Sequence, residues 1–584
     1  MMGHAVPPGE GDSPALLGGR LSRRQLFTRT LQTGAVIGGG TVVAALLDAC
    51  GGTTNSPSAT LSTGSGSSSS STGSSSSGTT TTSTPAPAAA STGTAGTLTI
   101  PLISNPTPNP ITLPGGLSSI LLNKNLFGQL CRPDANNPST PTPDHAEKWE
   151  ISTDGLTYTF HLRQGLKFHD GTPLTADDVK FTFDSITDPK VNGAFKNNLG
   201  PFDHAEVVDP QTVNLIMKQA YGPLMVMLDY NIMIVPKHVL SGQDLNKPVA
   251  YIQNPIASGP YKFKEFVSGD HLTLVANPDY WDGAPKIGTV VYKILPDVNT
   301  QVAQLRTGEV DVVMIEPSQV DALSGQSNVV INTAAQTNYY YLGVNNSNPL
   351  FSDVRVRQAL AYALDRQTIV TSVMRDKATL ANGPISPPMG WAYPKDQQPF
   401  PYDVKKAQDL LTQAGWTLQN GKLMKDGKPF AFKILLDVGN PTRKSFALAA
   451  QQYYQKLGMD PQIDSEDFNK WYDMSSNSQY DLAVEWWITP PDPDALYGGY
   501  SDDNTDKYKN ADVDNLFLQG RQQSTPDKRA PIYAQLQQKL YQDQVDVFML
   551  YPEEFRGFSK RLQGYTNIGI RDALYYTYKW TLNG

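Results

Sequence analysis

Two adjacent tryptophans, Trp486 and Trp487, offer the clearest binding chemistry in this sequence. They end an apolar run that begins near residue 481 and has the composition of a β-strand. Neighbouring side chains of a strand point to opposite faces, so one indole could pack in a core while the other faces a cleft. An indole in a cleft can stack on a planar or apolar group of a bound molecule. Core packing of both is the alternative, and the same two interpretations apply to Tyr340.

The other residues with reactive side chains have structural interpretations. His145, His161 and His169 lack the tight spacing of metal ligands. The sequence carries no Walker A loop, no HExxH motif and no nucleophile elbow. We therefore expect no enzyme activity, no cofactor and no metal site. A secreted hydrolase that uses two carboxylates is the alternative, because such enzymes carry no short signature.

Composition excludes several classes of protein. The chain has 584 residues and a formal net charge of -8, a field that disfavours binding to nucleic acid. Hydrophobic residues make up 39% and charged residues 17%, which excludes a multi-span membrane protein and a wholly disordered chain. The two cysteines, Cys50 and Cys131, cannot build a disulfide scaffold or a multi-cysteine zinc site.

Residues 1–49 have the pattern of a signal peptide. Arg23 and Arg24 precede an uncharged apolar run at 34–47. This run is too short to cross about 30 Å of hydrocarbon as a helix, and it has the length of a signal-peptide core. The paired arginines resemble a twin-arginine export signal. A general-secretion signal that happens to carry two arginines is the alternative.

Cys50 follows the apolar run in a segment that resembles a lipobox. At such a site signal peptidase cleaves before the cysteine, and a diacylglycerol is attached to its sulfur. Ala49 and Gly51 are small, as the cleavage site requires. A buried free cysteine is the alternative, but the residues that follow cannot form a core around it. We expect acyl chains on Cys50 to hold the protein at the membrane surface.

Residues 50–96 are predicted to be a disordered linker rich in Ser, Thr and Gly. The segment has no charge and no aromatic residue, so it cannot bury enough surface to offset the entropy of ordering. We expect it to tether a folded head that starts near Thr97 and to let that head swivel near the membrane.

Strand and helix patterns alternate along the folded head, which predicts an α/β protein. The segment 156–162 alternates apolar and polar residues as a half-buried strand does. Thr175 is placed to cap a helix that follows it. Apolar residues recur at helical spacing in four further segments, which are expected to be helices: 353–365, 403–414, 444–457 and 531–542. Two apolar runs, 432–436 and 481–486, are expected to be strands.

The segment AEKWEISTDGLTYTFHLRQGLKFHDGTPLTADDV at 146–179 strongly resembles the signature of bacterial extracellular solute-binding proteins, family 5. These are the oligopeptide- and dipeptide-binding proteins of ABC importers. Four further segments agree in order, and the resemblance covers 97–584. They are NPIASGPY (254–261), NPDYW (277–281), QLRTGEVD (304–311) and VRQALAYALDR (356–366).

The resemblance implies a two-lobed, clam-shell fold of the type II periplasmic-binding-protein kind, with a hinge between the lobes. We place the first lobe at 97–340 plus 546–584, with an extra subdomain at 132–257, and the second lobe at 341–545. Ligand would lie in the cleft between the lobes, and a membrane permease would receive it from the closed form. The expected location is the outer face of the cytoplasmic membrane or the periplasm, as a monomer.

The resemblance also implies where ligand groups would be held. Peptide-binding members grip the peptide's amino group with an aspartate shortly after the tryptophan strand, and counting back from Asp492 puts Thr489 there. Asp492 itself is a second candidate for ligand contact. Dipeptide-specific members place an arginine for the carboxylate after the strand at 432–436. Asp437 matches that position here, with Arg443 as a substitute.

Both ionic anchors for a free dipeptide are thus in doubt, and burying either peptide terminus unpaired would be costly. A longer peptide or a solute without charged ends fits better, and an oligosaccharide or a metal complex is the alternative to a peptide. Three further residues are candidates for ligand contact. Ser258 and Gly259 lie in the family's Gly-Pro-Tyr turn, where glycine permits close approach, and Asn345 offers an amide; a plain turn is the alternative for all three.

Overall fold

The computed structural model of the chain describes residues 96–113, 116–487, 490–501, 504–565 and 574–583. The predicted signal peptide and nearly all of the predicted linker, including Arg23, Arg24 and Cys50, lie outside the described residues. Within the described ranges, no helix is both long and apolar enough to cross a membrane.

A four-stranded sheet forms the base of the first lobe. Its order is β1 (Thr97–Leu102), β10 (Thr289–Ile294), β9 (His271–Ala276) and β8 (Tyr261–Val267). β1 runs parallel to β10, and the other pairs are antiparallel. Helix α2 (Gly116–Leu126) packs beside this sheet and contributes Leu122 and Leu126 to its core.

The segment at 146–217 forms a second, antiparallel sheet with the order β4-β5-β7-β6. Strand β5 (Thr157–Leu162) alternates buried and half-buried residues, which agrees with the pattern expected for 156–162. Helix α3 (Ala176–Thr187) begins after Thr175, whose side chain and that of Asp178 form a capping box. The strands and helices of this region follow. They are β2 (Cys131–Pro133), β3 (Pro141–Pro143), β4 (Ala146–Ile151), β6 (Phe202–Asp209), β7 (Thr212–Met217), α4 (Leu224–Asn231), α5 (Lys237–Leu240) and α6 (Val249–Gln253).

The second lobe is built on β13 (Tyr339–Val344), β20 (Leu482–Trp487), β18 (Ala431–Asp437) and β19 (Asp460–Glu466), adjacent in that order. β18 is buried on both faces, which explains why it is a nearly continuous apolar run. Phe432 packs against the helices of one face, while Leu435 contacts Trp471 on the other.

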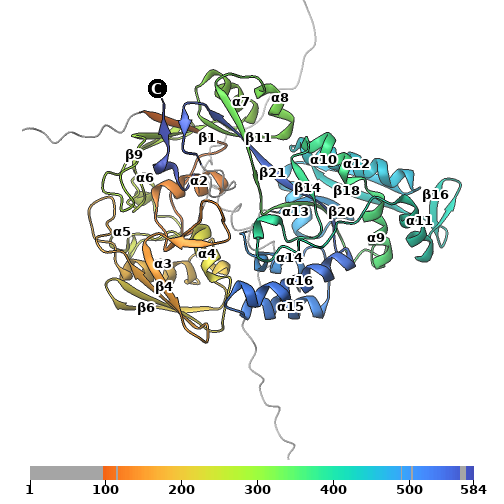
Figure 1. Cartoon of the computed structure of the whole chain (residues 1–584), viewed down its shortest axis with the longest axis horizontal. Helices are drawn as coiled ribbons and strands as arrows, with labels where there is room; N and C mark the ends of the chain where they lie inside the picture. Colours follow the sequence, from red (N-terminus) through yellow and green to blue (C-terminus); the bar gives the residue numbers. More distant parts are fainter. Residues whose placement is uncertain (1–95, 114–115, 488–489, 502–503, 566–573, 584) are drawn as a thin grey trace, which may run out of the picture. The chain divides into compact units, whose positions relative to one another are not determined.

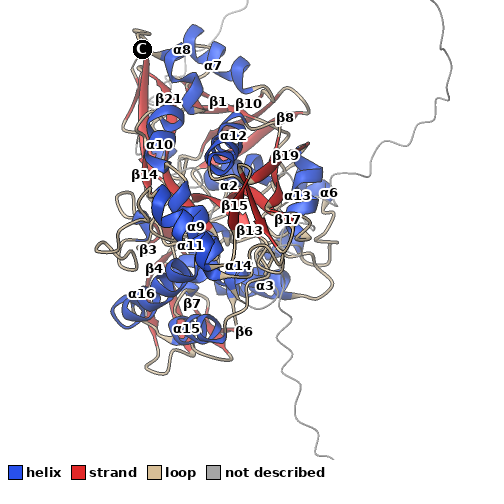
Figure 2. Ribbon diagram, turned by 90° about the vertical axis from the view of Figure 1, so that its right-hand side faces the viewer, coloured by secondary structure: helices blue, strands red, loops and turns tan. Residues whose placement is uncertain are grey.

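The helices of this lobe appear in blue in Figure 2. Three of them match their predicted segments within a few residues, and each begins at a polar cap. They are α9 (Val354–Ala363), α11 (Val404–Gln413) and α12 (Pro441–Lys456). The remaining elements of the lobe are α10 (Arg366–Met374), β14 (Ala378–Leu380), β15 (Thr417–Gln419), β16 (Lys422–Lys425), β17 (Lys428–Pro429), α13 (Phe468–Ser476), α14 (Tyr497–Tyr500) and α15 (Ala511–Gln522).

One predicted boundary is wrong. Helix α16 spans Pro526–Asp543, so it begins one turn before the predicted start at Pro531. Thr525 and Pro526 are a favourable start, since proline lacks the N–H that a first helical turn leaves unpaired. Pro531 lies inside the helix.

Strand β21 (Val547–Ser559) joins the two regions of sheet. Its first residues pair with β13 and β14, and its last residues pair with β11 (Val312–Ile315) and β12 (Val329–Ala335). Figure 1 shows β21 passing from beside β14 to beside β11. The chain makes a second passage between β12 and β13 at residues 336–338. Helices α7 (Val298–Thr307) and α8 (Val320–Leu323) cover the β11–β12 end, which has its own small core around Leu305 and Phe555.

Candidate functional site

A cavity of about 310 Å³ lies where β21 and the β12–β13 connection pass between the two regions of sheet. The end of β1 and the first turns of α2 line it on one side. Residues of β13, β20 and the start of α12 line it on the other. Its size is at the lower end of the range usual for sites that hold small ligands. Both lobes therefore contribute to one enclosed space.

The aromatic wall of this cavity is formed by Tyr340 and Trp486, which are directly opposite each other on β13 and β20. Their rings are stacked, with 6.3 Å between centroids and 28° between planes. Phe446 meets Tyr340 edge-on at 4.9 Å, which holds the tyrosine ring in place. Burial raises the pKa of the Tyr340 hydroxyl, so it stays protonated and can donate a hydrogen bond. Trp486 and Tyr340 thus occupy the place predicted for ligand-stacking residues.

Trp487 and Thr489 cannot be assessed in the same way. Trp487 ends β20 opposite Tyr339, and its side chain lies outside what the structure describes. Thr489 lies outside the described residues altogether.

Three glutamates contribute to the lining of the cavity: Glu316, Glu553 and Glu554. Glu553 and Glu554 are neighbours on β21, so their side chains point to opposite faces of the strand, and Glu554 shares its face with Arg556. Burial raises the pKa of Glu316, opposed by a hydrogen bond of 3.1 Å from the Thr442 hydroxyl and by the nearby charge of Arg443. Sequence reasoning missed these residues.

Glu554 forms an ion pair with Arg556, two positions further along β21. Burial raises the pKa of Glu554 despite that partner, and it is the larger effect. The available signal was the pair Glu553-Glu554 in an otherwise apolar strand, where charge is unusual.

Asn338 lies in the second passage of the chain and lines the same cavity. The residue is 4% exposed, and its Oδ1 has no hydrogen-bond partner among the residues that the structure describes. A buried amide oxygen without a partner is costly, so it is a position where a ligand donor would be favoured.

Asp437 and Arg443 lie behind the cavity and do not line it. Their side chains form an ion pair of 3.4 Å with each other, and both are almost fully buried. The guanidinium of Arg443 also lies 4.3 Å from the centre of the Trp471 ring. Asn440 and Thr442, in the turn that starts α12, line the cavity instead of Asp437 and Arg443. The predicted anchors therefore hold the start of this helix.

Ser258, Gly259 and Asn345 also have structural partners. Ser258 Oγ lies 3.0 Å from His145 Nε2, and the Gly259 N–H donates to Leu126 O at 2.9 Å. A Cβ on Gly259 would lie 2.5 Å from the carbonyl carbon of Leu126, so the glycine permits close packing against α2. Asn345 donates to the carbonyls of Ser478 and Tyr480. None of the three lines the cavity.

Asp492, the last of the predicted ligand contacts, is fully buried outside the cavity. Both of its carboxylate oxygens accept from the guanidinium of Arg529, at 2.5 and 2.7 Å. Its Oδ1 also accepts a hydrogen bond from the Asp494 N–H. Asp492 thereby caps the short 3-10 helix at Pro493–Leu496.

Ser258, His145 and Asp144 are arranged like the triad of a hydrolase. His145 Nδ1 lies 3.2 Å from Asp144 Oδ1, so one imidazole joins a serine and an aspartate. However, His145 and Asp144 are fully buried, and a Cβ on Gly128 would lie 1.8 Å from the imidazole. A substrate could not reach a serine packed in this way, so the arrangement gives no support to the hydrolase alternative.

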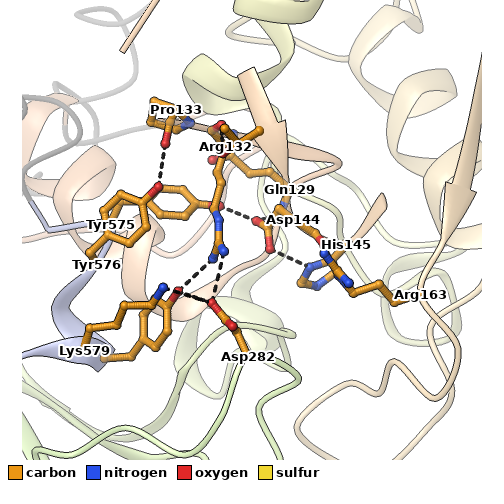
Figure 3. Close-up of polar contacts among 12 residues, drawn as sticks. Gln129, Arg132, Pro133, Asp144, His145, Arg163, Asp282, Tyr575, Tyr576 and Lys579 are labelled. Atoms are coloured by element: carbon orange, nitrogen blue, oxygen red, sulfur yellow. Dashed lines mark hydrogen bonds and ion pairs between the residues drawn. The ribbon is translucent and has the colours of Figure 1, made fainter. Parts of the chain in front are cut away.

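Figure 3 shows the network to which this aspartate belongs. Asp144 also accepts from the Gln129 N–H at 3.1 Å and from the Tyr575 hydroxyl. Arg132 donates to Asp282 at 3.0 Å and to the Tyr578 hydroxyl at 2.8 Å. These contacts attach the C-terminal residues 574–580 to the first lobe.

Within the residues that the structure describes, no three His, Cys, Asp or Glu side chains are grouped to hold a metal ion.

Comparison with known proteins gives concordant matches. Residues 140–508 match the family described as bacterial extracellular solute-binding proteins, family 5 Middle. The oligopeptide-binding protein AppA of Bacillus subtilis is 33% identical over 456 residues, which cover 75% of this chain and 83% of that protein.

Solved structures of other proteins match the fold of this chain. AppA of Bacillus subtilis in complex with a nonapeptide has a TM-score of 0.71 at 30% identity, over 84% of this chain and 99% of that one. NikZ of Campylobacter jejuni in complex with Ni(L-His) has a TM-score of 0.73 at 29% identity, over 83% and 99%. The two-lobed fold expected from the sequence is therefore confirmed.

Proposed function

We propose, from the premise that this chain belongs to the bacterial extracellular solute-binding proteins of family 5, that it captures peptides for an ABC importer. The chain is a substrate-binding protein of an ABC transporter, and the identity of its ligand is the proposal. The observation that carries it is the cavity, which both lobes line and which lies beside both passages of the chain.

The mechanism follows from the placement of the cavity. A ligand that touches both lobes stabilises the closed form more than the open form, and it shifts the population toward closure. β21 and residues 336–338 are the segments about which the lobes would move. A permease that recognises the closed form would then receive only loaded protein.

A peptide fits the lining of the cavity. The stacked rings of Tyr340 and Trp486 offer a surface for an apolar or aromatic side chain. Asn338, Glu316 and the Tyr340 hydroxyl offer hydrogen-bonding groups for a backbone or an end group. The relative AppA is named for oligopeptides, and NikZ was solved with a nickel–histidine complex, so the ligand class must be tested directly.

Export and anchoring complete the proposal. Arg23 and Arg24 would direct export, and a lipid on Cys50 would keep the head near its permease, through the linker at 50–96. A Cys50→Ser variant expressed in a bacterial host that processes lipoproteins should move from the membrane fraction to the soluble fraction. Retention in the membrane fraction would argue against a lipid at this residue.

Thermal unfolding with ligand libraries tests the function. We expect peptides of some lengths to raise the melting temperature of the purified protein without being consumed, as binding without turnover requires. Oligosaccharides and nickel–histidine complexes serve as the competing libraries. If these raise the melting temperature and no peptide does, the peptide assignment is wrong; appearance of cleaved product would favour the hydrolase.

A further inference from the structure

We propose that the cavity is a subsite for a positively charged amine, held by the carboxylates of Glu316 and Glu554 and by the amide oxygen of Asn338. This deepens the proposed function and rests on it: the transported solute carries an ammonium or guanidinium group beside an apolar part. In a peptide, that group would be the amino terminus or a basic side chain.

The charges that line the cavity do not balance. The lining includes Glu316 and the ion pair of Glu554 with Arg556, so it carries one carboxylate more than it has guanidinium groups on that face of β21. Arg556 is already committed, because it pairs with Glu554 and donates to the Tyr565 hydroxyl at 3.1 Å. Within the described part of the chain, Glu316 forms no ion pair, and the donor of its hydrogen bond is the neutral Thr442 hydroxyl. A cation is therefore the group that this space lacks.

The hydrogen-bonding groups have the matching polarity. Asn338 is 4% exposed, and no described residue donates a hydrogen bond to its Oδ1. Carboxylate oxygens only accept, and an ammonium has three N–H donors and no acceptor. An amine could therefore satisfy Asn338 and one or two carboxylates at once, whereas an anionic group would meet a surface of acceptors.

The acidity of the carboxylates agrees with this interpretation. Burial raises the pKa of Glu316, although the hydrogen bond from Thr442 and the charge of Arg443 lower it. Burial also raises the pKa of Glu554, although its partner Arg556 lowers it. The phenols of Tyr340 and Tyr565 are the other titratable groups that face them. A bound cation would favour the ionised carboxylates, so amine binding should release protons and weaken as pH falls.

The aromatic wall lets the cavity hold the rest of the ligand. Trp486 and Tyr340 both line the cavity, and aromatic rings attract both apolar groups and cations. The same space therefore accepts an amine with an apolar or aromatic neighbour.

Two pairs of probes test the inference by isothermal titration of the purified protein. The first pair is phenethylammonium and 2-phenylethanol, which differ only in the amine. The second is the tripeptide Phe-Ala-Ala and its N-acetylated form. We expect the charged member of each pair to bind about 10- to 100-fold more tightly, the range for hydrogen bonds to charged groups.

Variants locate the effect. Glu316→Gln should abolish most of the preference for the charged probe, so that the ratio of the two affinities within each pair falls toward one. Because Glu554→Gln alone would leave Arg556 buried and unpaired, the double variant E554Q/R556M is the safer test of the second carboxylate. Glu147→Gln, on an exposed position of β4, is the matched control and should behave as the wild type.

The outcomes separate this inference from the proposed function. Equal binding of charged and neutral probes, or a preference that E316Q leaves intact, overturns the amine subsite while peptide binding stands. Binding of phenethylammonium with no binding of either peptide supports the subsite and argues against peptide as the solute. If no amine probe binds at millimolar concentration, the inference is wrong.

Discussion

Arg529 of α16 and Asp492, five residues beyond the end of β20, form a two-point ion pair with N–O distances of 2.5 and 2.7 Å. The aspartate is fully buried and the arginine is 3% exposed. The guanidinium also donates to the Gly520 carbonyl and to the Tyr533 hydroxyl. This pair fixes the segment that follows the tryptophan strand, so it supports the cavity wall from outside.

An Arg529→Met variant should therefore be strongly destabilised. It leaves the carboxylate of Asp492 buried without its partner, a change that costs about 3–5 kcal/mol in buried ion pairs. The midpoint of urea denaturation measures the loss. Lys528→Met, at the exposed neighbouring position of the same helix, is the matched control and should unfold like the wild type. Equal midpoints for the two variants would show that the pair contributes little.

A Trp486→Leu variant tests the aromatic wall. Leucine keeps the apolar character but loses the stacking with Tyr340, so we expect affinity for an aromatic peptide or amine to fall about 3- to 10-fold, as aromatic pairs suggest. Titration calorimetry measures the change. Trp149→Leu, on β4 outside the cavity, should leave the affinity unchanged. Loss of affinity in both variants would point to a general defect rather than to a lost contact.

An Asn338→Leu variant should separate binding from stability. Because no described residue bonds to Oδ1 of Asn338, replacement of this side chain by an apolar group of similar size should leave the melting temperature of the empty protein unchanged or raise it. The affinity for phenethylammonium should fall by about 5-fold or more. A variant that melts early and still binds normally would mean that the amide serves the fold and not the ligand.

Much of the fold could be predicted because its signals are local. The alternation at 156–162 corresponds to β5, and the polar caps Asp353, Asp403 and Asn440 begin the helices near the predicted segments. Such patterns depend on neighbours within a few residues. The predicted start of α16 at Pro531 is wrong, because Thr525 and Pro526 provide a more favourable helix start earlier in the chain.

The candidate site was harder to predict than the fold, because its residues are far apart in the sequence and come together only in the folded chain. Trp486 and Tyr340 were predicted from their chemistry, and the sheet places them opposite each other. Asp492 stands close to the tryptophans in the sequence, but its partner Arg529 lies 37 residues away and withdraws it from the cavity. Charge within the apolar segment around Glu554 is a local signal, but it does not show that the residue lines the cavity, because that depends on the passage of β21 between the two regions of sheet.

A contact remote from the cavity should influence affinity through closure. On the predicted lobe boundaries, Tyr221 belongs to the first lobe and Arg521 to the second. The Tyr221 hydroxyl donates to Asp494 at 3.1 Å, Arg521 donates to the same oxygen at 2.9 Å, and the Gly222 N–H donates to the Arg521 carbonyl.

Tyr221→Phe removes the hydroxyl that donates across the lobes to Asp494, so it should destabilise the closed form and weaken every ligand about 3- to 10-fold, whatever its charge, since the closed population falls. Titration calorimetry gives the affinity, and small-angle scattering should show a larger mean radius at subsaturating ligand. Arg355→Met, which removes an exposed ion pair within the second lobe, is the control. Loss of affinity for amine probes only would contradict a role in closure.

Acid should weaken the attachment of the C-terminal residues to the first lobe. Burial by itself would raise the pKa of Asp144, but His145, Arg132 and the hydrogen bond from Tyr575 outweigh it and lower the pKa from 3.8 to about 2. A depressed folded-state pKa gives stability that is complete above about pH 4 and is lost as the pH falls toward 2, about 2 kcal/mol in all. Asp144→Asn should therefore be less stable than the wild type at pH 6, and the gap should narrow between pH 4 and pH 2 in urea titrations. Glu147→Gln should track the wild type throughout, and a gap that stays constant with pH would exclude Asp144 as the titrating group.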